Sequence, residues 1–93
     1  MARKPVTQDR EIPSLSLQGE ASITRYAVKS PYGGGLALEV RAGKSKRFVY
    51  RYRIAGSQAT AVLGNYPALS LARARIEHAE LVSLVKKGID PRK

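Results

Sequence analysis

The sequence predicts an α+β fold in which a small antiparallel β-sheet of three to four strands packs on one C-terminal α-helix. Between residues 23 and 63, apolar and polar residues alternate in short runs separated by glycine-containing turns. This alternation is typical of antiparallel strands with one buried face. Between residues 71 and 87, apolar residues instead recur every three or four positions, as they do along one side of a helix. Burying the sheet face against the helix stripe gives a two-layer domain.

Size and composition limit the kinds of protein that this chain can be. Its 93 residues suffice for one small domain with a thin core and little room for a deep substrate cleft. The absence of cysteine excludes both a disulfide framework and a thiolate metal site, and it fits a reducing compartment. No apolar run approaches the ~18–20 residues of a membrane span, and no secretory signal core follows the first residues. We therefore expect a soluble, cytoplasmic protein without membrane contact.

The start of the chain shows neither the alternation of a strand nor the spacing of a helix. Residues 1–22 show no sustained pattern and are interrupted by prolines and a glycine, so we expect a flexible N-terminal arm there. The folded domain is expected to occupy residues 23–88, and residues 89–93 are interpreted as the start of a linker.

The predicted sheet consists of short strands joined by turns. The strands are expected at residues 23–28, 36–41, 47–54 and 59–63. The third alternates most clearly, because Phe48, Tyr50, Tyr52 and Ile54 share one side and Arg47, Val49, Arg51 and Arg53 share the other. The segment 55–58 is interpreted as a tight turn, and Gly64-Asn65-Tyr66-Pro67 is expected to end the sheet.

One helix follows the sheet. Ser70 is a favourable N-cap residue, and the helix is expected to run from Leu71 to Lys87. Gly88 suits the left-handed position after a helix, and Pro91 prevents further winding. The apolar stripe of this helix is expected to consist of Leu71, Ala74, His78, Leu81 and Val85.

Charge is distributed unevenly along the chain. The formal net charge is +10, and none of the seven acidic residues lies within residues 40–76. The same segment contains Arg41, Lys44, Lys46, Arg47, Arg51, Arg53, Arg73 and Arg75. A domain with such segregation presents a positive face, whose usual partner is a phosphate backbone. Charge alone is also compatible with an acidic protein or an anionic membrane.

The alternation predicts the composition of the positive face. Arginine pairs with guanine through two hydrogen bonds, and the methyl groups of valine and threonine contact thymine methyls. Lys44 and Lys46 are expected at a hairpin tip, where phosphates are the favoured target. The other candidate DNA-contacting residues lie on the side of the sheet away from the core, and they are Arg41, Arg47, Val49, Arg51, Arg53, Thr60 and Val62. The alternative is a merely solvated charged face, which is common on one side of antiparallel sheets.

Two arginines stand at the start of the predicted helix. Arg73 and Arg75 lie at the positive end of the helix dipole, where cations are unfavourable. One hypothesis is that they form a phosphate clamp together with the free N–H groups of the helix. The alternative is that Arg75 packs along the sheet and Arg73 is solvated.

No residue pattern indicates catalysis, a cofactor or a metal. His78 is the single histidine and lies on the apolar stripe, so a structural role is expected. The glycines at 33–35 are not followed by the Lys-Ser/Thr and helix start of a phosphate-binding loop. No His and Arg partners accompany the tyrosines to activate a nucleophile.

Several motifs, in this order along the chain, resemble the amino-terminal arm-type DNA-binding domain of phage and genomic-island integrases, which are tyrosine recombinases. The motifs are Gly34-Gly35-Leu36-Ala37-Leu38-Glu39-Val40, Arg51-Tyr52-Arg53, Leu63-Gly64-Asn65-Tyr66-Pro67, Ser70-Leu71-Ala72-Arg73-Ala74-Arg75 and Gly88-Ile89-Asp90-Pro91. The resemblance covers residues 26–91.

The resemblance implies binding of double-stranded DNA, with the sheet in the major groove of arm sites that flank the recombination core site. It implies a non-catalytic part of an integrase that supports site-specific recombination and DNA integration, with a linker at 89–93 to absent core-binding and catalytic domains. Other integrase protomers and accessory DNA-bending or excision factors are implied as further partners. The implied setting is the bacterial cytoplasm near the nucleoid, and the isolated domain is expected to be a monomer.

Two alternative functions remain at this point. Small sheet-plus-helix domains also bind double-stranded RNA, through groove shape and 2′-hydroxyl groups. The domain could instead be a protein-interaction module whose helix, with Glu77 and Glu80, docks on a recombinase or an accessory factor.

Overall fold

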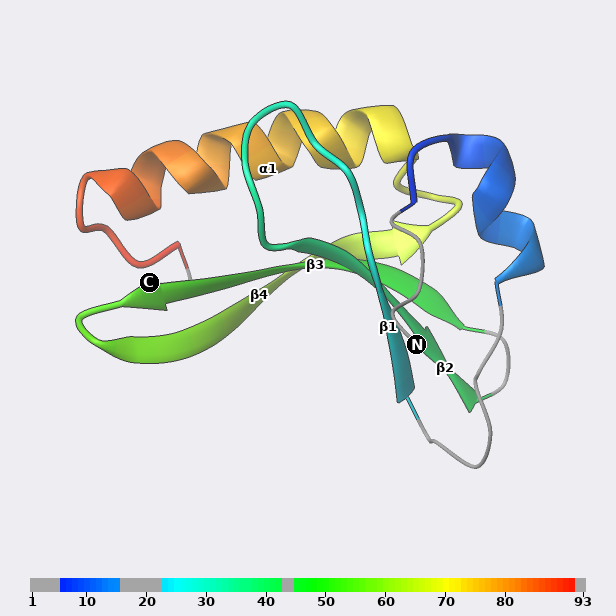
Figure 1. Cartoon of the computed structure of the whole chain (residues 1–93), viewed down its shortest axis with the longest axis horizontal. Helices are drawn as coiled ribbons and strands as arrows, with labels where there is room; N and C mark the ends of the chain where they lie inside the picture. Colours follow the sequence, from blue (N-terminus) through cyan, green and yellow to red (C-terminus); the bar gives the residue numbers. More distant parts are fainter. Residues whose placement is uncertain (1–5, 16–22, 43–44, 92–93) are drawn as a thin grey trace.

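The computed structural model describes residues 6–15, 23–42 and 45–91, which form a four-stranded antiparallel sheet with one long helix across one face (Figure 1). The strand order is β1-β2-β3-β4, so each strand pairs with its neighbour in sequence. The elements are the 3₁₀ helix η1 (Asp9–Ser14), β1 (Ile23–Ala27), β2 (Leu36–Arg41), β3 (Lys46–Ile54), β4 (Ser57–Tyr66) and α1 (Leu71–Lys86). This architecture confirms the predicted α+β fold. No helix in these ranges is long and apolar enough to cross a bilayer.

The last strand is longer than the sequence predicted. The turn before it contains only Ala55 and Gly56, whose φ angles of 52° and 79° are typical of a two-residue hairpin turn. Ser57 and Gln58 therefore belong to β4 and not to the turn, which corrects the predicted start at residue 59.

The predicted end of this strand was also wrong. The pairing register of β3 and β4 shifts where Phe48 pairs with Gly64 and Val49 pairs with Val62, so Leu63 in β4 is the extra residue of a bulge. The strand then continues to Tyr66. Gly64 was expected to end the sheet, but it lies within the strand, where a Cβ atom would be 3.2 Å from Leu69 Cδ2.

The core lies between the sheet and α1. Phe48 and Leu38 are fully buried at its centre, and Tyr50 and Tyr52 stack with ring centroids 5.1 Å apart. The predicted stripe of the helix is confirmed, because Leu71, Ala74 and His78 are buried and Leu81 and Val85 pack against the tyrosines.

Residues 6–15 contribute to this core, although the sequence predicted a flexible arm over residues 1–22. Val6 pairs with Val28 in a parallel bridge and has 2% of its surface exposed, and Ile12 has 0%. The Val6 N–H donates to Ala27 O at 2.7 Å, and the Lys29 N–H donates to Val6 O at 2.7 Å. Both residues belong to the buried cluster around Phe48 and Leu38, although no periodic run contains them. Residues 1–5 and 16–22 lie outside the described part of the chain.

Both ends of α1 follow the predicted capping chemistry. The Arg73 N–H donates to Ser70 Oγ at 3.2 Å, which confirms the N-cap. At the other end the Ile89 N–H donates to Leu84 O at 2.9 Å around Gly88, whose φ is +79°, in a Schellman arrangement. Beyond this turn the chain comes back toward the sheet (Figure 1). There Tyr52 Oη donates to Asp90 Oδ1 at 2.5 Å.

His78 fastens the loop between β1 and β2 to the helix. Its Nε2 lies 2.9 Å from Gly34 O, and its Nδ1 lies 2.9 Å from Ser30 Oγ. Because a carbonyl oxygen only accepts, Nε2 carries the proton and Nδ1 accepts from the serine hydroxyl. Burial lowers the pKa of His78, although the bond to Gly34 acts in the opposite direction. The structural role predicted for this histidine agrees with these contacts.

Candidate nucleic-acid interface

The side of the sheet that faces away from α1 is the candidate interface, and we call it the open face. Strand alternation and register assign side chains to it, because core residues such as Phe48 point to the other side. Its members with printed register partners are Ile23, Arg25, Ala27, Ala37, Glu39, Arg41, Arg47, Val49, Arg51, Arg53, Gln58, Thr60, Val62 and Asn65.

One part of the open face is a two-stranded ribbon formed by the last residues of β3 and the first residues of β4. The last residue pair between β2 and β3 is Leu36 with Tyr50, so the remainder of the hairpin extends past the β2 edge (Figure 1). Arg51 and Arg53 are exposed on this ribbon, opposite Thr60 and Gln58. Both arginines therefore face uncharged cross-strand partners, and their positive charge is directed to whatever approaches the ribbon.

The ribbon is anchored at its base by Gly35. The Arg51 N–H donates to Gly35 O at 2.8 Å. The φ of Gly35 is +92°, and a Cβ atom there would lie 2.3 Å from Arg51 O. Only glycine fits this conformation and this close approach, so the turn before β2 positions the base of the ribbon.

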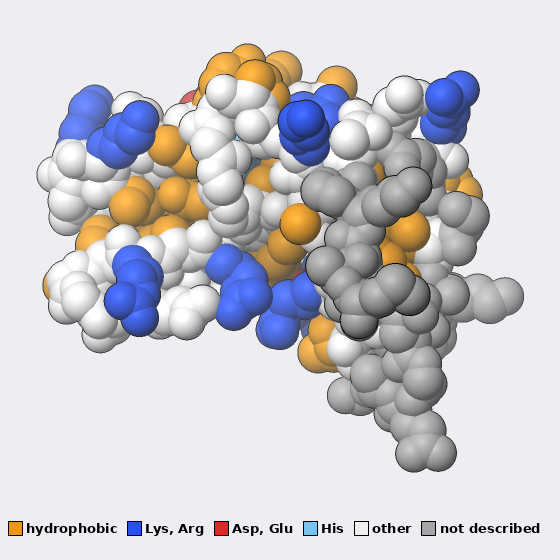
Figure 2. All heavy atoms as spheres, in the orientation of Figure 1, with side chains coloured by type: hydrophobic (Ala, Val, Ile, Leu, Met, Phe, Trp, Pro, Cys, Tyr) orange, Lys and Arg blue, Asp and Glu red, His pale blue; other side chains and the backbone are white. Residues whose placement is uncertain are grey.

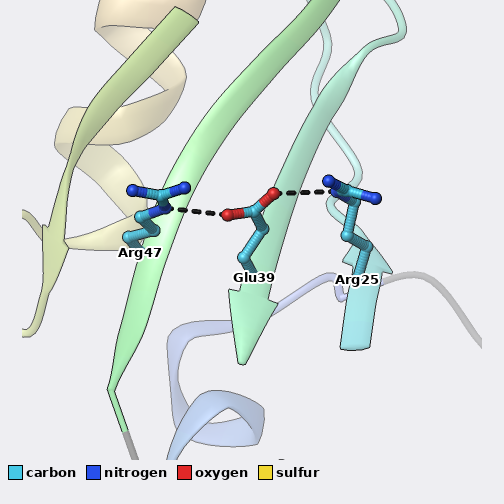
Figure 3. A network of polar contacts seen from close by, with 3 residues as sticks. All are labelled: Arg25, Glu39 and Arg47. Atoms are coloured by element: carbon cyan, nitrogen blue, oxygen red, sulfur yellow. Dashed lines mark hydrogen bonds and ion pairs between the residues drawn. The ribbon is translucent and has the colours of Figure 1, made fainter. Parts of the chain in front are cut away.

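The second part of the open face contains an acid, although only cationic and uncharged residues were predicted for this face. Arg25, Glu39 and Arg47 lie in register on three adjacent strands, and we call them the Arg–Glu–Arg row (Figure 3). Glu39 Oε2 accepts from Arg25 Nε at 2.8 Å, and Oε1 accepts from Arg47 Nε at 2.7 Å. Glu39 directly precedes the acid-free segment and alternates onto the same side as the predicted cations, so the face is not purely positive.

The carboxylate of this row is almost fully covered. The side chain of Glu39 is 2% exposed, whereas those of Arg25 and Arg47 are 46% and 29% exposed. Burial alone would raise the pKa of Glu39, but the hydrogen bonds and charges of Arg47 and Arg25 outweigh it and the pKa is lowered. Glu39 is therefore an ionised acceptor that holds both guanidinium groups.

Arg25 is not among the interface residues predicted from the sequence. This residue precedes the acid-free segment. The one sequence feature that places it on the open face is the alternation of the first strand, in which Arg25 and Tyr26 point to opposite sides. With Arg51 it borders a hollow of about 440 Å³ in the open face. The lining consists of Arg25, Ala27, Gly35, Leu36, Ala37, Arg51 and Gln58.

The other predicted sheet residues occupy different environments. Thr60 is exposed and Val62 is 54% exposed, as a base contact requires, and Arg41 is half-buried at the end of β2. Val49 lies on the open face but is 0% exposed, so it presents no surface to a thymine methyl. Lys46 pairs with Val40 and Tyr66 on the side of the core. Lys44 lies outside the described residues.

The two helix arginines belong to the opposite layer. Arg75 Nε donates to Lys29 O at 2.9 Å and its Nη2 donates to Thr7 O at 2.8 Å, so it ties two loops to α1. Arg73 is exposed beside the N-cap. Space-filling shows Lys and Arg side chains along both the helix layer and the sheet layer (Figure 2). The structure thus divides the predicted cations between two surfaces.

The described ranges contain no group of three or more His, Asp or Glu side chains that could hold a metal ion. The charged groups of the open face are instead suited to recognising an anion, because arginines dominate and the one carboxylate among them is covered.

Comparisons with known proteins identify the family. A search of curated proteins found no significant match. A family model described as an arm DNA-binding domain matches residues 8–93. The order of elements and the basic open face agree with the earlier resemblance, which the match confirms. The chain belongs to the arm DNA-binding domain family, whose members are non-catalytic DNA-binding domains of integrases.

Proposed function

We propose that this domain binds double-stranded DNA by placing the open face, led by the β3–β4 ribbon, in the major groove of arm-type sites. The observation that supports this most strongly is the ribbon itself. A two-stranded β-ribbon fits the major groove, and this one presents Arg51 and Arg53 with neutral partners beyond the edge of β2. The parent protein is then a tyrosine recombinase, and the domain supports its site-specific recombination and DNA integration.

Each exposed group of the ribbon has a suitable DNA partner. The guanidinium groups of Arg51 and Arg53 match O6 and N7 of guanine, and the Gln58 amide matches adenine. The methyl groups of Thr60 and Val62 match thymine methyls. Cations beside the groove, such as Arg41 at the end of β2, complement the phosphates and set the register of the domain.

Substitution in each layer tests this proposal. Arg51→Ala and Arg53→Ala should each weaken binding to a preferred duplex by about 1–3 kcal/mol. Lys86→Ala removes the same charge from the exposed surface of α1 and is the matched control. The duplex is first selected from a random library, and affinity is measured by fluorescence anisotropy. Equal losses for all three variants would contradict a sheet-directed interface and would leave only general attraction to phosphate.

Double-stranded RNA is the control ligand. A major-groove ribbon cannot enter the deep and narrow major groove of A-form RNA. We therefore expect the selected DNA duplex to bind more tightly than an RNA duplex of the same sequence, and the reverse order would favour the RNA alternative.

One observation favours a protein contact in addition. A groove of about 490 Å³ lies between α1 and the loop before β2, on the layer away from the open face. Its lining consists of Pro31, Tyr32, Ala79, Val82, Ser83, Lys86 and Lys87. An integrase protomer or an accessory factor could occupy this groove while DNA occupies the sheet. Tyr32→Ala should then weaken the protein complex and leave DNA affinity unchanged, as measured by anisotropy and co-sedimentation.

A further inference from the structure

The Arg–Glu–Arg row poses a physical question about the open face. A buried carboxylate lowers the positive potential of a surface that binds phosphate, so Glu39 opposes the general electrostatic attraction. Buried ion pairs also add little to stability, because apolar replacements of similar volume are often equally stable. Neither general affinity nor stability therefore accounts for an acid at this position.

The geometry of the row indicates what the acid does. Both arginines use Nε to reach Glu39, at 2.8 and 2.7 Å, and each keeps its two terminal nitrogens beyond that contact (Figure 3). A guanidinium group that is held at Nε still has both terminal NH₂ groups for an end-on pair of hydrogen bonds. Long arginine side chains normally lose rotamer freedom when they bind, and a side chain that is already held loses less.

We propose that Glu39 is a positioning residue that holds Arg25 and Arg47 as a pair of base-reading side chains, and that this pair contributes sequence specificity. The inference rests on the proposed function of the open face. The pair spans β1, β2 and β3, so its backbones lie about 10 Å apart at the usual strand spacing. This separation corresponds to the rise of about three base pairs. The ligand that the row selects is therefore DNA with guanines at two nearby positions.

The row and the ribbon make different contributions in this account. The two guanidinium groups and the one carboxylate of the row sum to a single positive charge, so the row adds little phosphate attraction for the number of hydrogen-bond donors it presents. The row contributes hydrogen-bond donors that are held in a fixed direction. Loss of the carboxylate should therefore reduce specificity while general affinity stays constant or increases.

Selection from a random duplex library tests the inference. The wild-type chain, Glu39→Gln, Glu39→Asp and Arg25→Lys each select duplexes, and the enriched sequences are compared position by position. Glu39→Gln removes the charge, Glu39→Asp keeps the charge but shortens the reach, and Arg25→Lys keeps the charge but removes the fork. We expect each variant to lose preference at one or both guanine positions, with a loss of about 5- to 150-fold against the wrong base.

A second readout separates positioning from a structural role. Affinity for a scrambled duplex should be unchanged for Glu39→Asp and Arg25→Lys and should rise for Glu39→Gln. A purely structural role would lower affinity for both duplexes together. Circular dichroism checks whether each variant is folded. Arg25→Lys tests whether this side chain reads a base even if the Glu39 variants do not fold.

The outcomes distinguish this inference from the proposed function. If the wild-type chain enriches a sequence and all folded variants enrich the same sequence equally, the positioning role is overturned and the proposed function stands. If the wild-type chain enriches no sequence, specific DNA binding itself is overturned and the inference falls with it.

Discussion

The two parts of the open face use the same side chain in different ways. On the β3–β4 ribbon, Arg51 and Arg53 are exposed and lie opposite neutral residues. In the Arg–Glu–Arg row, Arg25 and Arg47 share a buried carboxylate. An arginine with a neutral partner contributes its full charge to the attraction of DNA. An arginine held by an acid contributes less net charge, but its hydrogen-bond donors have a fixed orientation. Counting cations along the sequence therefore cannot show what each of them does.

The largest expected effect concerns the base of the ribbon. Gly35→Ala should destabilise the domain by about 3 kcal/mol or more, because the added Cβ would lie 2.3 Å from Arg51 O at a φ of +92°. Gly34→Ala is the control, since a Cβ there would meet nothing within 4 Å. Urea unfolding followed by circular dichroism measures both. Similar midpoints for the two variants would show that the ribbon base is not rigidly held.

Salt dependence separates the ribbon from the row. The double variant Arg51→Ala/Arg53→Ala removes two charges and should reduce the slope of log affinity against log salt by at most about 1.8, the value for two neutralised phosphates. Replacing the whole row by Arg25→Met, Glu39→Leu and Arg47→Met removes one net charge and should reduce the slope by at most about 0.9. Anisotropy titrations at several salt concentrations give both slopes. A larger change for the row than for the ribbon would reverse the comparison.

His78 makes stability depend on pH in a defined direction. Its pKa is lowered in the folded protein, so the unfolded chain takes up the proton more readily. The stabilisation is therefore complete above about pH 6.5 and is lost as the pH falls below that value toward the folded-state pKa. Thermal unfolding at pH 7.5 and pH 5.5 should show a greater loss for the wild-type chain than for His78→Gln. An equal loss would assign the pH dependence to other groups.

The smallest expected effect concerns the helix start. Arg73 occupies the position where a glutamate would complete a capping box with Ser70. Arg73→Glu should therefore raise the free energy of unfolding by about 0.5–1 kcal/mol, as measured by urea unfolding. Arg73→Ala should leave the salt slope of DNA binding unchanged, because this residue lies in the helix layer. A reduced slope would instead support the phosphate clamp.

The sequence was sufficient to predict the elements that depend on local pattern. The alternation around Phe48 and the helical spacing from Leu71 placed the sheet, the helix and the buried faces. Ser70 and Gly88 marked the ends of the helix, because capping depends on neighbouring residues alone.

The features that the sequence analysis missed depend on contacts between distant residues. Gly64 was expected to end the sheet, but the strand continues through it after the bulge at Leu63, and the side chain of Leu69 lies against it. Val6 and Ile12 belong to no periodic run, yet they fill the core. Glu39 meets its two arginines only after three strands are in register, and no pattern along the chain shows that register.

The most direct test of DNA binding by the open face is an NMR titration of the isotope-labelled domain. A duplex with candidate arm repeats and a scrambled duplex are each added at two salt concentrations. If the open face reads DNA, the repeats should cause larger shifts that are confined to open-face residues in β1 to β4 and that persist at the higher salt. Equal shifts for both duplexes, or shifts centred on α1 with an unperturbed sheet, would contradict DNA reading by the open face.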